Sequence, residues 1–460
     1  MMGRILRIEL RRSAALGVAL LSLVVATATL LSYTEGFAGR WMQLAVSGRS
    51  LLMVMCPLAL AGGAWLGRRD SRSRVDELFT STARPRWQRV LPTAGALAIT
   101  LVTAYILMLL IGAAWVLPTA GYFPIAAIAV SAVGVLSLIA AGWLGMAAGR
   151  AMPRLVTAPA LAVVSVALLA LLPDYLSVAS MVEDRSDPAA LLLTPVYIGG
   201  LDDLQTVVAR VNLTQALWLA ALAATGLLLL GAVGRRAITL AVLPAVLGAA
   251  VAIPLMPTGG YDAAAAVDPD AAELVCDNDG WQVCVTRAHA GLLPDVVGPA
   301  RLALTMMAAK LPGAPSRAVE TRRVQSWAQP DDAAPAAKAD RAHTLVFDAP
   351  PIGRTGRADL TDADFLPGLL EAAWRQDCGG QQEDQDAYLA RTVAAAWLTG
   401  QLPVAQSWWV PGDPERVSAA YQTLIGLPEA EQERRMVEAR DAALACRTDA
   451  LRSILPTDGP

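Results

Sequence analysis

The stretch AITLAVLPAVLGAAVAIPLM, from Ala237 to Met256, is twenty residues long and contains no charged side chain. An α-helix rises about 1.5 Å per residue, so a run of this length crosses the hydrocarbon core of a bilayer. The triplet GRR (234–236) comes directly before it, and the flexible stretch PTGG (257–260) directly after it. This stretch therefore predicts a membrane helix at the end of the apolar part of the chain.

Six more apolar runs precede this one, and together they predict seven membrane spans. They are Ser13 to Tyr33, Leu51 to Gly67, Val90 to Leu117, Pro124 to Gly149, Leu155 to Leu172 and Leu213 to Val233. The second and fifth runs are short for a span, and none of the seven contains a charged residue. The last two runs could instead form one bent helix, but together they are too long for one crossing, so a tight turn at 234–236 is the better interpretation.

The distribution of arginines predicts the orientation of these spans, because short loops rich in Lys and Arg stay in the cytoplasm. With the N-terminus inside, fifteen arginines lie in inside segments and four in outside segments. The outside four are Arg40, Arg49, Arg185 and Arg210. Ala26-Thr27-Ala28 has the small residues of a signal-peptide cleavage site, but the apolar run continues past it to Tyr33. We therefore expect a retained first helix, a cytoplasmic N-terminus and an extracytoplasmic C-terminal part.

Composition supports a membrane protein and excludes some partners. Charged residues make up 17% of the 460 residues, below the roughly 25% of soluble domains. The net charge is -3, which gives no electrostatic reason to expect a nucleic-acid partner. The bias toward Arg and Ala is typical of GC-rich bacterial genomes, so we expect a location in a bacterial plasma membrane.

The part from 261 to 460 is polar and predicts an α+β domain outside the cell. Strands are expected at Trp281 to Thr286 and at Ala342 to Asp348, with a turn at 277–280 before the first of them. Helices are expected after a capping box formed by Thr361 and Asp364, from Asp386 to Leu398 before Gly400, and from Glu429 to Leu455. The segment Gln329 to Asp340 is expected to be a loop.

Four of the five cysteines lie in this polar part, as expected for disulfides in an oxidising compartment. They are Cys276, Cys284, Cys378 and Cys446, and four cysteines allow three pairings. Cys276 with Cys284 is favoured because a turn lies between them, and Cys378 with Cys446 would then join two helices.

Several enzymatic motifs are missing from the sequence. Neither lysine, Lys310 or Lys338, follows a glycine as the phosphate-binding loop of ATPases requires. His289 and His343 are 54 residues apart and neither lies in an H-E-x-x-H motif, so a surface or structural role is expected for both. We expect no catalytic residues, no metal ligands and no cofactor; the energy source for any transport would be a separate protein.

Three features of the membrane part indicate which class of protein would supply the energy for transport. Residues 1–12 (MMGRILRIELRR) have the apolar and basic pattern of an interfacial helix, although a basic flank that sets orientation explains them equally. The predicted cytoplasmic loop 68–89 (RRDSRSRVDELFTSTARPRWQR) contains a short helical piece flanked by arginines, although a plain basic loop has the same composition. The outside segment 173–212 contains the apolar run Ala189 to Leu193, too short to span and therefore interfacial or re-entrant.

In this order, the three features resemble the membrane subunit of type-two ATP-binding-cassette (ABC) exporters. The resemblance covers about residues 1–233 and is architectural. It implies a six-span permease-like domain over 13–233, to which this chain adds a seventh span (237–256) and a domain at 261–460. It also implies that the loop 68–89 docks on a cytoplasmic ABC ATPase through Asp76, Glu77, Leu78 and Phe79. Arg84 and Arg86 would lie near the surface of that ATPase. Some actinobacterial permeases are similar in carrying such a tail with a cysteine pair.

The preferred hypothesis is therefore the permease subunit of an ABC exporter, working as a homodimer or with a paralogue on an amphipathic or hydrophobic peptide, antibiotic or lipid. The runner-up is a membrane-anchored sensor or interaction protein whose exported domain binds a ligand, although seven spans exceed what an anchor needs. A third hypothesis is an extracytoplasmic enzyme that uses carboxylates such as Asp362, Asp364 and Glu371, which helix capping explains as well.

Overall fold

The computed structural model is mostly helical and describes residues 14–69, 87–182, 188–196, 200–260, 262–322, 340–360, 365–375, 385–402, 414–447 and 454. The chain divides into two compact units. Unit 1 comprises residues 1–118 and 123–266, and unit 2 comprises residues 119–122 and 267–460. We describe each unit by itself.

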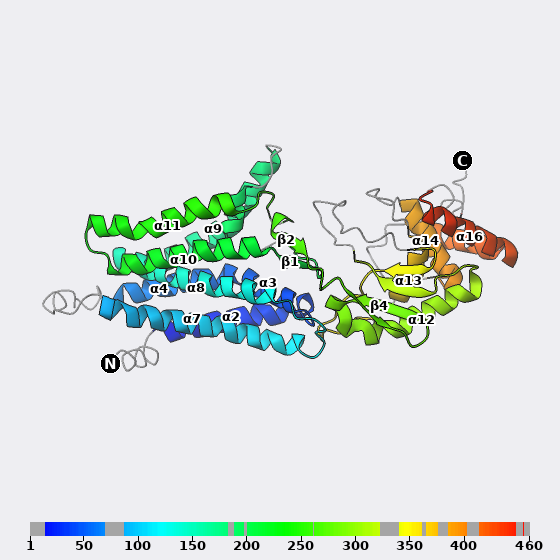
Figure 1. The fold of residues 1–460 in the computed structure, drawn as a ribbon, viewed down its shortest axis with the longest axis horizontal. Helices are drawn as coiled ribbons and strands as arrows, with labels where there is room; N and C mark the ends of the chain where they lie inside the picture. The colour runs from blue at the N-terminus through cyan, green and yellow to red at the C-terminus, as the bar shows by residue number, and fades with distance from the viewer. Residues whose placement is uncertain are drawn as a thin grey trace. The chain divides into compact units, whose positions relative to one another are not determined.

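Unit 1 is a bundle of α-helices that run side by side (Figure 1). The helices are α2 (Ala14–Ser32), α3 (Trp41–Ser50), α4 (Leu52–Gly67), α7 (Trp87–Val116), α8 (Ala126–Ala151), α9 (Thr157–Val182), α10 (Ala209–Gly231) and α11 (Arg235–Leu255). The 3-10 segments η1 (Thr34–Gly36), η2 (Ala189–Leu193) and η3 (Asp262–Ala264) lie between or after them, and β1 (Gln205–Val207) pairs with β2 (Ala265–Val267).

Seven helices in the described part of the chain are long and apolar enough to cross a membrane. Six lie in unit 1, at Ala15–Ser32, Val90–Val116, Ala126–Ala151, Thr157–Ser180, Ala209–Gly231 and Arg235–Leu255, and one, Arg287–Lys310, lies in unit 2. In addition, α3 and α4 pass the same test as a pair bent by 44°. Apolar side chains are exposed along much of the bundle, as on α9 and α11, where Val163 and Leu240 are 69% and 66% exposed. These helices have the length and composition of a polytopic membrane protein.

The candidate span in unit 2 packs differently from the candidate spans in unit 1. Its main part, α12 (Leu293–Lys310), buries one face in the core of unit 2, through Val296, Ala300, Ala303, Leu304 and Met307. These positions repeat at three- and four-residue intervals, which is the pattern of an amphipathic helix on a globular core. We therefore assign α12 to the core of unit 2. The candidate spans of unit 1 are then its six single helices and the bent pair.

Helical structure continues beyond the two predicted apolar runs that were short for a span. The second predicted span, Leu51 to Gly67, is extended at its N-terminus by α3 across the bend at Leu51. The fifth, Leu155 to Leu172, continues as α9 through Pro173 to Val182. The tight turn between the last two spans is confirmed, and Gly234 adopts a positive φ of 82° there.

Glycines allow α4 and α8 to approach each other closely. A Cβ built on Gly63 or Gly67 would lie 2.2 or 2.1 Å from the carbonyl oxygen of Gly142 or Met146 in α8. A Cβ on Gly145 or Gly149 would lie 2.1 Å from a carbonyl oxygen of α4. Both helices thus carry glycines four residues apart at their contact, the pattern that lets membrane helices pack backbone to backbone.

Unit 2 contains a four-stranded sheet in the order β3-β4-β5-β6. The strands are β3 (Leu274–Asp277), β4 (Gln282–Thr286), β5 (Arg317–Glu320) and β6 (Thr344–Phe347). β3 and β4 are antiparallel, whereas β4, β5 and β6 are parallel, with α12 in the crossover from β4 to β5. The two predicted strands are confirmed as β4 and β6.

The helices of unit 2 complete its core. They are η4 (Arg287–Leu292), α12, α13 (Phe365–Glu371), η5 (Ala372–Trp374), α14 (Gln385–Thr399), α15 (Pro414–Ile425) and α16 (Glu429–Leu444). The prediction for α14 is confirmed, including its end at Gly400, which has a positive φ of 73°. The helix predicted to reach Leu455 is wrong at its end, because α16 stops at Leu444 and Cys446 adopts a positive φ of 57°. Thr361, Asp364 and residues 329–339 of the predicted loop lie outside the described residues.

The favoured disulfide between Cys276 and Cys284 is confirmed. The two residues face each other across the β3–β4 hairpin, whose turn at 277–280 was also predicted. Cys446 is disulfide-bonded as well, and Cys378, predicted to be its partner, lies outside the described residues. Cys56, in α4, is a buried free thiol.

Candidate functional site

The predicted ATPase-docking residues cannot be placed. Asp76, Glu77, Leu78, Phe79, Arg84 and Arg86 all lie outside the described residues, as do residues 1–12. Of the carboxylates considered for an enzyme, Asp362 and Asp364 also lie outside, while Glu371 in α13 accepts a hydrogen bond of 3.0 Å from Thr392 Oγ1. The candidate site in unit 1 therefore rests on other residues.

Arg49 forms the centre of a buried polar network in unit 1. Its side chain is completely buried (0% exposed). Nε and Nη2 donate to the carbonyl oxygen of Pro195, at 3.2 and 3.1 Å, and Nη2 also donates to Oε1 of Gln215 in α10, at 2.8 Å. A guanidinium group thus joins α3 and α10 to the chain that follows η2.

Gln215 extends this network to η2 itself. Its Nε2 donates to the carbonyl oxygens of Leu192, at 2.7 Å, and Thr194, at 3.4 Å. The apolar side chain of Leu192 is 1% exposed and packs in a core cluster that includes Val46 and Val211. The run predicted to be interfacial or re-entrant is therefore a short 3-10 segment held inside unit 1 by apolar packing and by hydrogen bonds to its carbonyl groups.

A second polar cluster lies at the start of the same helix α3. The Arg40 side chain forms a salt bridge with Asp203, with Nη1 at 2.6 and 2.9 Å from the two carboxylate oxygens. Gln43 donates to Asp203 Oδ1 and to the Leu201 carbonyl, both at 2.8 Å. Residues at the start and end of α3 therefore bind the connection between η2 and α10 on both sides of Gly200.

This arrangement corrects one expectation from the sequence. Arg49 was counted in an outside loop, and the spans were expected to contain no charge. The structure instead has Arg49 in a helix that forms a bent pair with α4, with its side chain buried. The missed signal was spacing: Met42, Ala45 and Val46 are all buried, and Arg49 is the next position on the same helical face.

Chemically, the network places a permanent positive charge among carbonyl and amide groups inside an apolar bundle. Ionisable groups within membrane segments are costly, and by default they mark functional positions. The network contains no nucleophile paired with a base, and no group of three or more metal-ligating side chains occurs in the described part of the chain. Its chemistry is that of binding and positioning.

Unit 2 has a buried polar cluster of its own, formed by Thr286, His289 and Glu320. The Nδ1 atom of His289 lies 2.5 Å from Oε1 of Glu320, and the two side chains are 5% and 2% exposed. Glu320 also accepts hydrogen bonds from the backbone N–H of Thr286, at 2.8 Å, and from its hydroxyl, at 3.1 Å. The cluster joins the ends of β4 and β5 to η4, and this gives His289 a structural role.

No family model, curated protein or solved structure matches this chain. The class of the protein is therefore defined by its own fold. The chain is a helical protein whose apolar helices are compatible with a multi-pass membrane protein, and it carries a C-terminal unit with a small mixed sheet.

Proposed function

We propose that the chain is the membrane-spanning permease subunit of an ABC exporter, driven by a separate cytoplasmic ATPase. The observation that supports this best is the short η2 segment between α9 and α10, which does not span and is held in the bundle by Arg49 and Gln215. Together with the spans around it, this segment has the order expected from the resemblance to type-two exporters.

In this proposal unit 1 forms the path for an amphipathic or hydrophobic cargo, together with a second copy or a paralogous chain. The exposed apolar faces of α9 and α11 suit contact with lipid or with another permease chain. The proposed location is a bacterial plasma membrane, with the N-terminus in the cytoplasm and unit 2 outside. The chain would carry out no reaction of its own.

Co-purification tests this proposal directly. Tagged full-length protein from its native membrane should bring down an ABC ATPase and ATP hydrolysis that is sensitive to vanadate. The triple substitution Asp76→Ala, Glu77→Ala and Phe79→Ala should abolish both without reducing the amount of membrane-inserted protein. A matched control, Ser71→Ala with Ser73→Ala and Thr80→Ala in the same stretch, should retain both.

Two outcomes would count against the proposal. If the wild-type chain purifies without an ATPase under conditions that keep other permease complexes intact, the sensor hypothesis is favoured. If the triple variant retains the ATPase, the docking assignment is wrong even though the partner class is right.

A further inference from the structure

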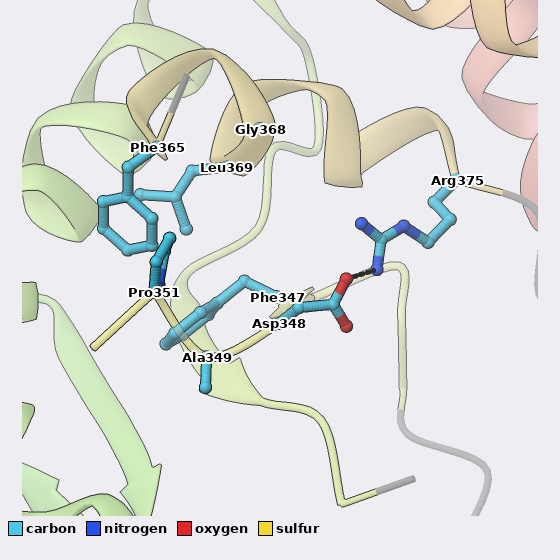
Figure 2. A pocket seen from close by; sticks show the side chains of 8 residues that line it. All are labelled: Phe347, Asp348, Ala349, Pro351, Phe365, Gly368, Leu369 and Arg375. Carbon is cyan, nitrogen blue, oxygen red and sulfur yellow. Dashed lines mark hydrogen bonds and ion pairs between the residues drawn. The ribbon is translucent and has the colours of Figure 1, made fainter. Parts of the chain in front are cut away.

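Unit 2 contains a small pocket at the carboxyl end of β6. Its apolar wall is formed by Phe347 and Pro351 on one side and by Phe365 and Leu369 of α13 on the other (Figure 2). The pocket has a volume of about 180 Å³. Pockets for drug-sized ligands begin at roughly 300 Å³, so this one can take a single apolar side chain rather than a lipid chain or a folded peptide.

The rim of the pocket carries one acid and one base. Arg375 Nη1 donates to Asp348 Oδ2 at 2.7 Å, and the pair lies at the opposite end of the pocket from Phe365 (Figure 2). The two side chains are 33% and 48% exposed. An ion pair that is this open to water stabilises a fold by about 0–1 kcal/mol, so a ligand can separate it at little cost.

The position of the pocket in the fold also suits a ligand. Asp348 directly follows the last residue of β6, a strand parallel to β4 and β5. In open sheets of parallel strands, ligands bind outside the carboxyl ends of the strands, at a point where the strand order reverses. β6 is the edge strand of this sheet, so the pocket shares the carboxyl end with such sites but not the reversal. Phe347 and Leu369 are 2% and 1% exposed, so the floor of the pocket is built from the core and is fixed in place.

We propose that this pocket binds a free apolar α-amino acid. The side chain fills the apolar cavity, the α-carboxylate binds Arg375 and the α-ammonium binds Asp348. A ligand with a single charge would leave one rim charge without its partner, whereas a zwitterion replaces one ion pair with two. The close spacing of the two rim charges matches the close spacing of the two charges in an amino acid.

Gly368 is a position in the pocket lining where a side chain can be added without disturbing the fold. It lies in α13 on the pocket wall, and a Cβ built on it meets no atom within 4 Å. A leucine at this position therefore projects into open space, and replacing a glycine inside a helix with a side chain is favourable by about 0.5–1 kcal/mol. Gly298 in α12 is equally open and lies away from the pocket lining, so Gly298→Leu is the matched control.

Saturation-transfer NMR on the full-length chain in lipid nanodiscs tests this proposal, with empty nanodiscs as the blank. L-leucine should bind saturably. Three analogues should each bind at least about tenfold more weakly, as expected for the loss of a charged hydrogen bond or of the apolar contact. These analogues are 4-methylpentanoate, which lacks the ammonium group, 3-methylbutylamine, which lacks the carboxylate, and glycine, which lacks the side chain.

The variants identify the site. Gly368→Leu should abolish leucine binding and Arg375→Gln should weaken it at least about tenfold, whereas Gly298→Leu should bind as the wild type does. Hydrogen exchange of β6 and α13 checks that each variant is folded. Three results would overturn the proposal: no saturable binding to the wild type, equal binding to the wild type and to folded Gly368→Leu, or equal affinity for leucine and 4-methylpentanoate. None of these outcomes bears on the ATPase association, so the site and the transport function are tested separately.

Discussion

Arg49 shows how one charged residue can hold several parts of an apolar helical bundle together. Its guanidinium group has a planar fork of donors, and Pro195 and Gln215 occupy positions on that fork. A lysine has a single point charge and cannot reproduce this geometry. The residue therefore determines where η2 and the segment after it lie against α3 and α10.

Replacing Arg49 with leucine should destabilise unit 1. The change removes charged hydrogen bonds worth about 1.5–3 kcal/mol each and leaves the buried Gln215 side chain without its donor. A lower thermal unfolding midpoint of the full chain in detergent is the expected measurement. Arg210→Leu, at an exposed arginine early in α10, should change the free energy of unfolding by less than about 0.5 kcal/mol. Equal effects of the two substitutions would show that Arg49 contributes no more than a surface residue.

The two histidines provide a second comparison at this scale, because each pairs with a carboxylate through Nδ1. His289 and Glu320 are buried, whereas His343 and Asp340 are 70% and 60% exposed at a distance of 2.8 Å. Glu320→Ala should destabilise unit 2 by about 1–3 kcal/mol, because it removes the acceptor of the buried Thr286 backbone N–H. Asp340→Ala should change stability by at most about 1 kcal/mol. Hydrogen exchange of β4 and β5 in the full chain would measure both effects, and similar protection in the two variants would contradict the structural role.

Among the contacts between elements, the one between α4 and α8 requires glycine, because a larger residue would clash with the backbone of the other helix. Gly145→Ala places a methyl group against the Leu60 carbonyl and should destabilise the bundle by about 1–3 kcal/mol, the usual cost of overpacking. Gly17→Ala in α2 is the control, because a Cβ at that position meets nothing within 4 Å. The control should be neutral or slightly stabilising. Thermal unfolding of both variants in the same detergent decides the question, and an unchanged midpoint for Gly145→Ala would refute the close approach.

Helix α16 contains an ion-pair network with a defined pH dependence. Hydrogen bonds from Arg434 and Arg435 lower the pKa of Glu431 from its ordinary value of 4.5 to about 2. A lowered pKa in the folded state means that the stabilisation is fully present above pH 4.5 and is lost as the pH falls through about 2. The protection of the α16 amides, measured as the exchange rate of an unfolded peptide divided by that of the protein at the same pH, should therefore fall as the pH is lowered from 4.5 to about 2. Glu431→Gln should lose this fall in protection, and the same pH profile in both proteins would exclude Glu431 as its source.

The elements also show what a sequence can predict. β4 and the end of α14 were predictable because their signals are local: alternation after a turn in one case, and Gly400 after a helical pattern in the other. β5 was not predicted, because Arg317–Glu320 is four residues long and owes its burial to pairing with β4 and β6 on either side. Arg49 was misplaced for a related reason, since its partners Pro195 and Gln215 are distant in sequence.

At the scale of the molecule, the two units differ in the kinds of side chain that they expose and bury. Unit 1 exposes long apolar side chains and buries Arg49, whereas unit 2 buries its apolar residues in one core and carries ion pairs such as those of α16 at the surface. The first pattern suits lipid and the second suits water. The disulfide between Cys276 and Cys284 in unit 2 further suits an oxidising compartment.

Reporter fusions to the full membrane part test the resulting topology. We expect alkaline phosphatase, which is active only outside the cytoplasm, to be active when fused after Gly260 and inactive when fused after Gly234. A fusion after Gly313 decides the role of α12, because that turn follows the helix directly. If α12 belongs to the soluble core, as its buried face indicates, the Gly313 fusion is active like the Gly260 fusion. An inactive Gly313 fusion beside an active Gly260 fusion would make α12 a membrane span and return the rest of unit 2 to the cytoplasm. An active Gly234 fusion would reverse the orientation that the arginines predict.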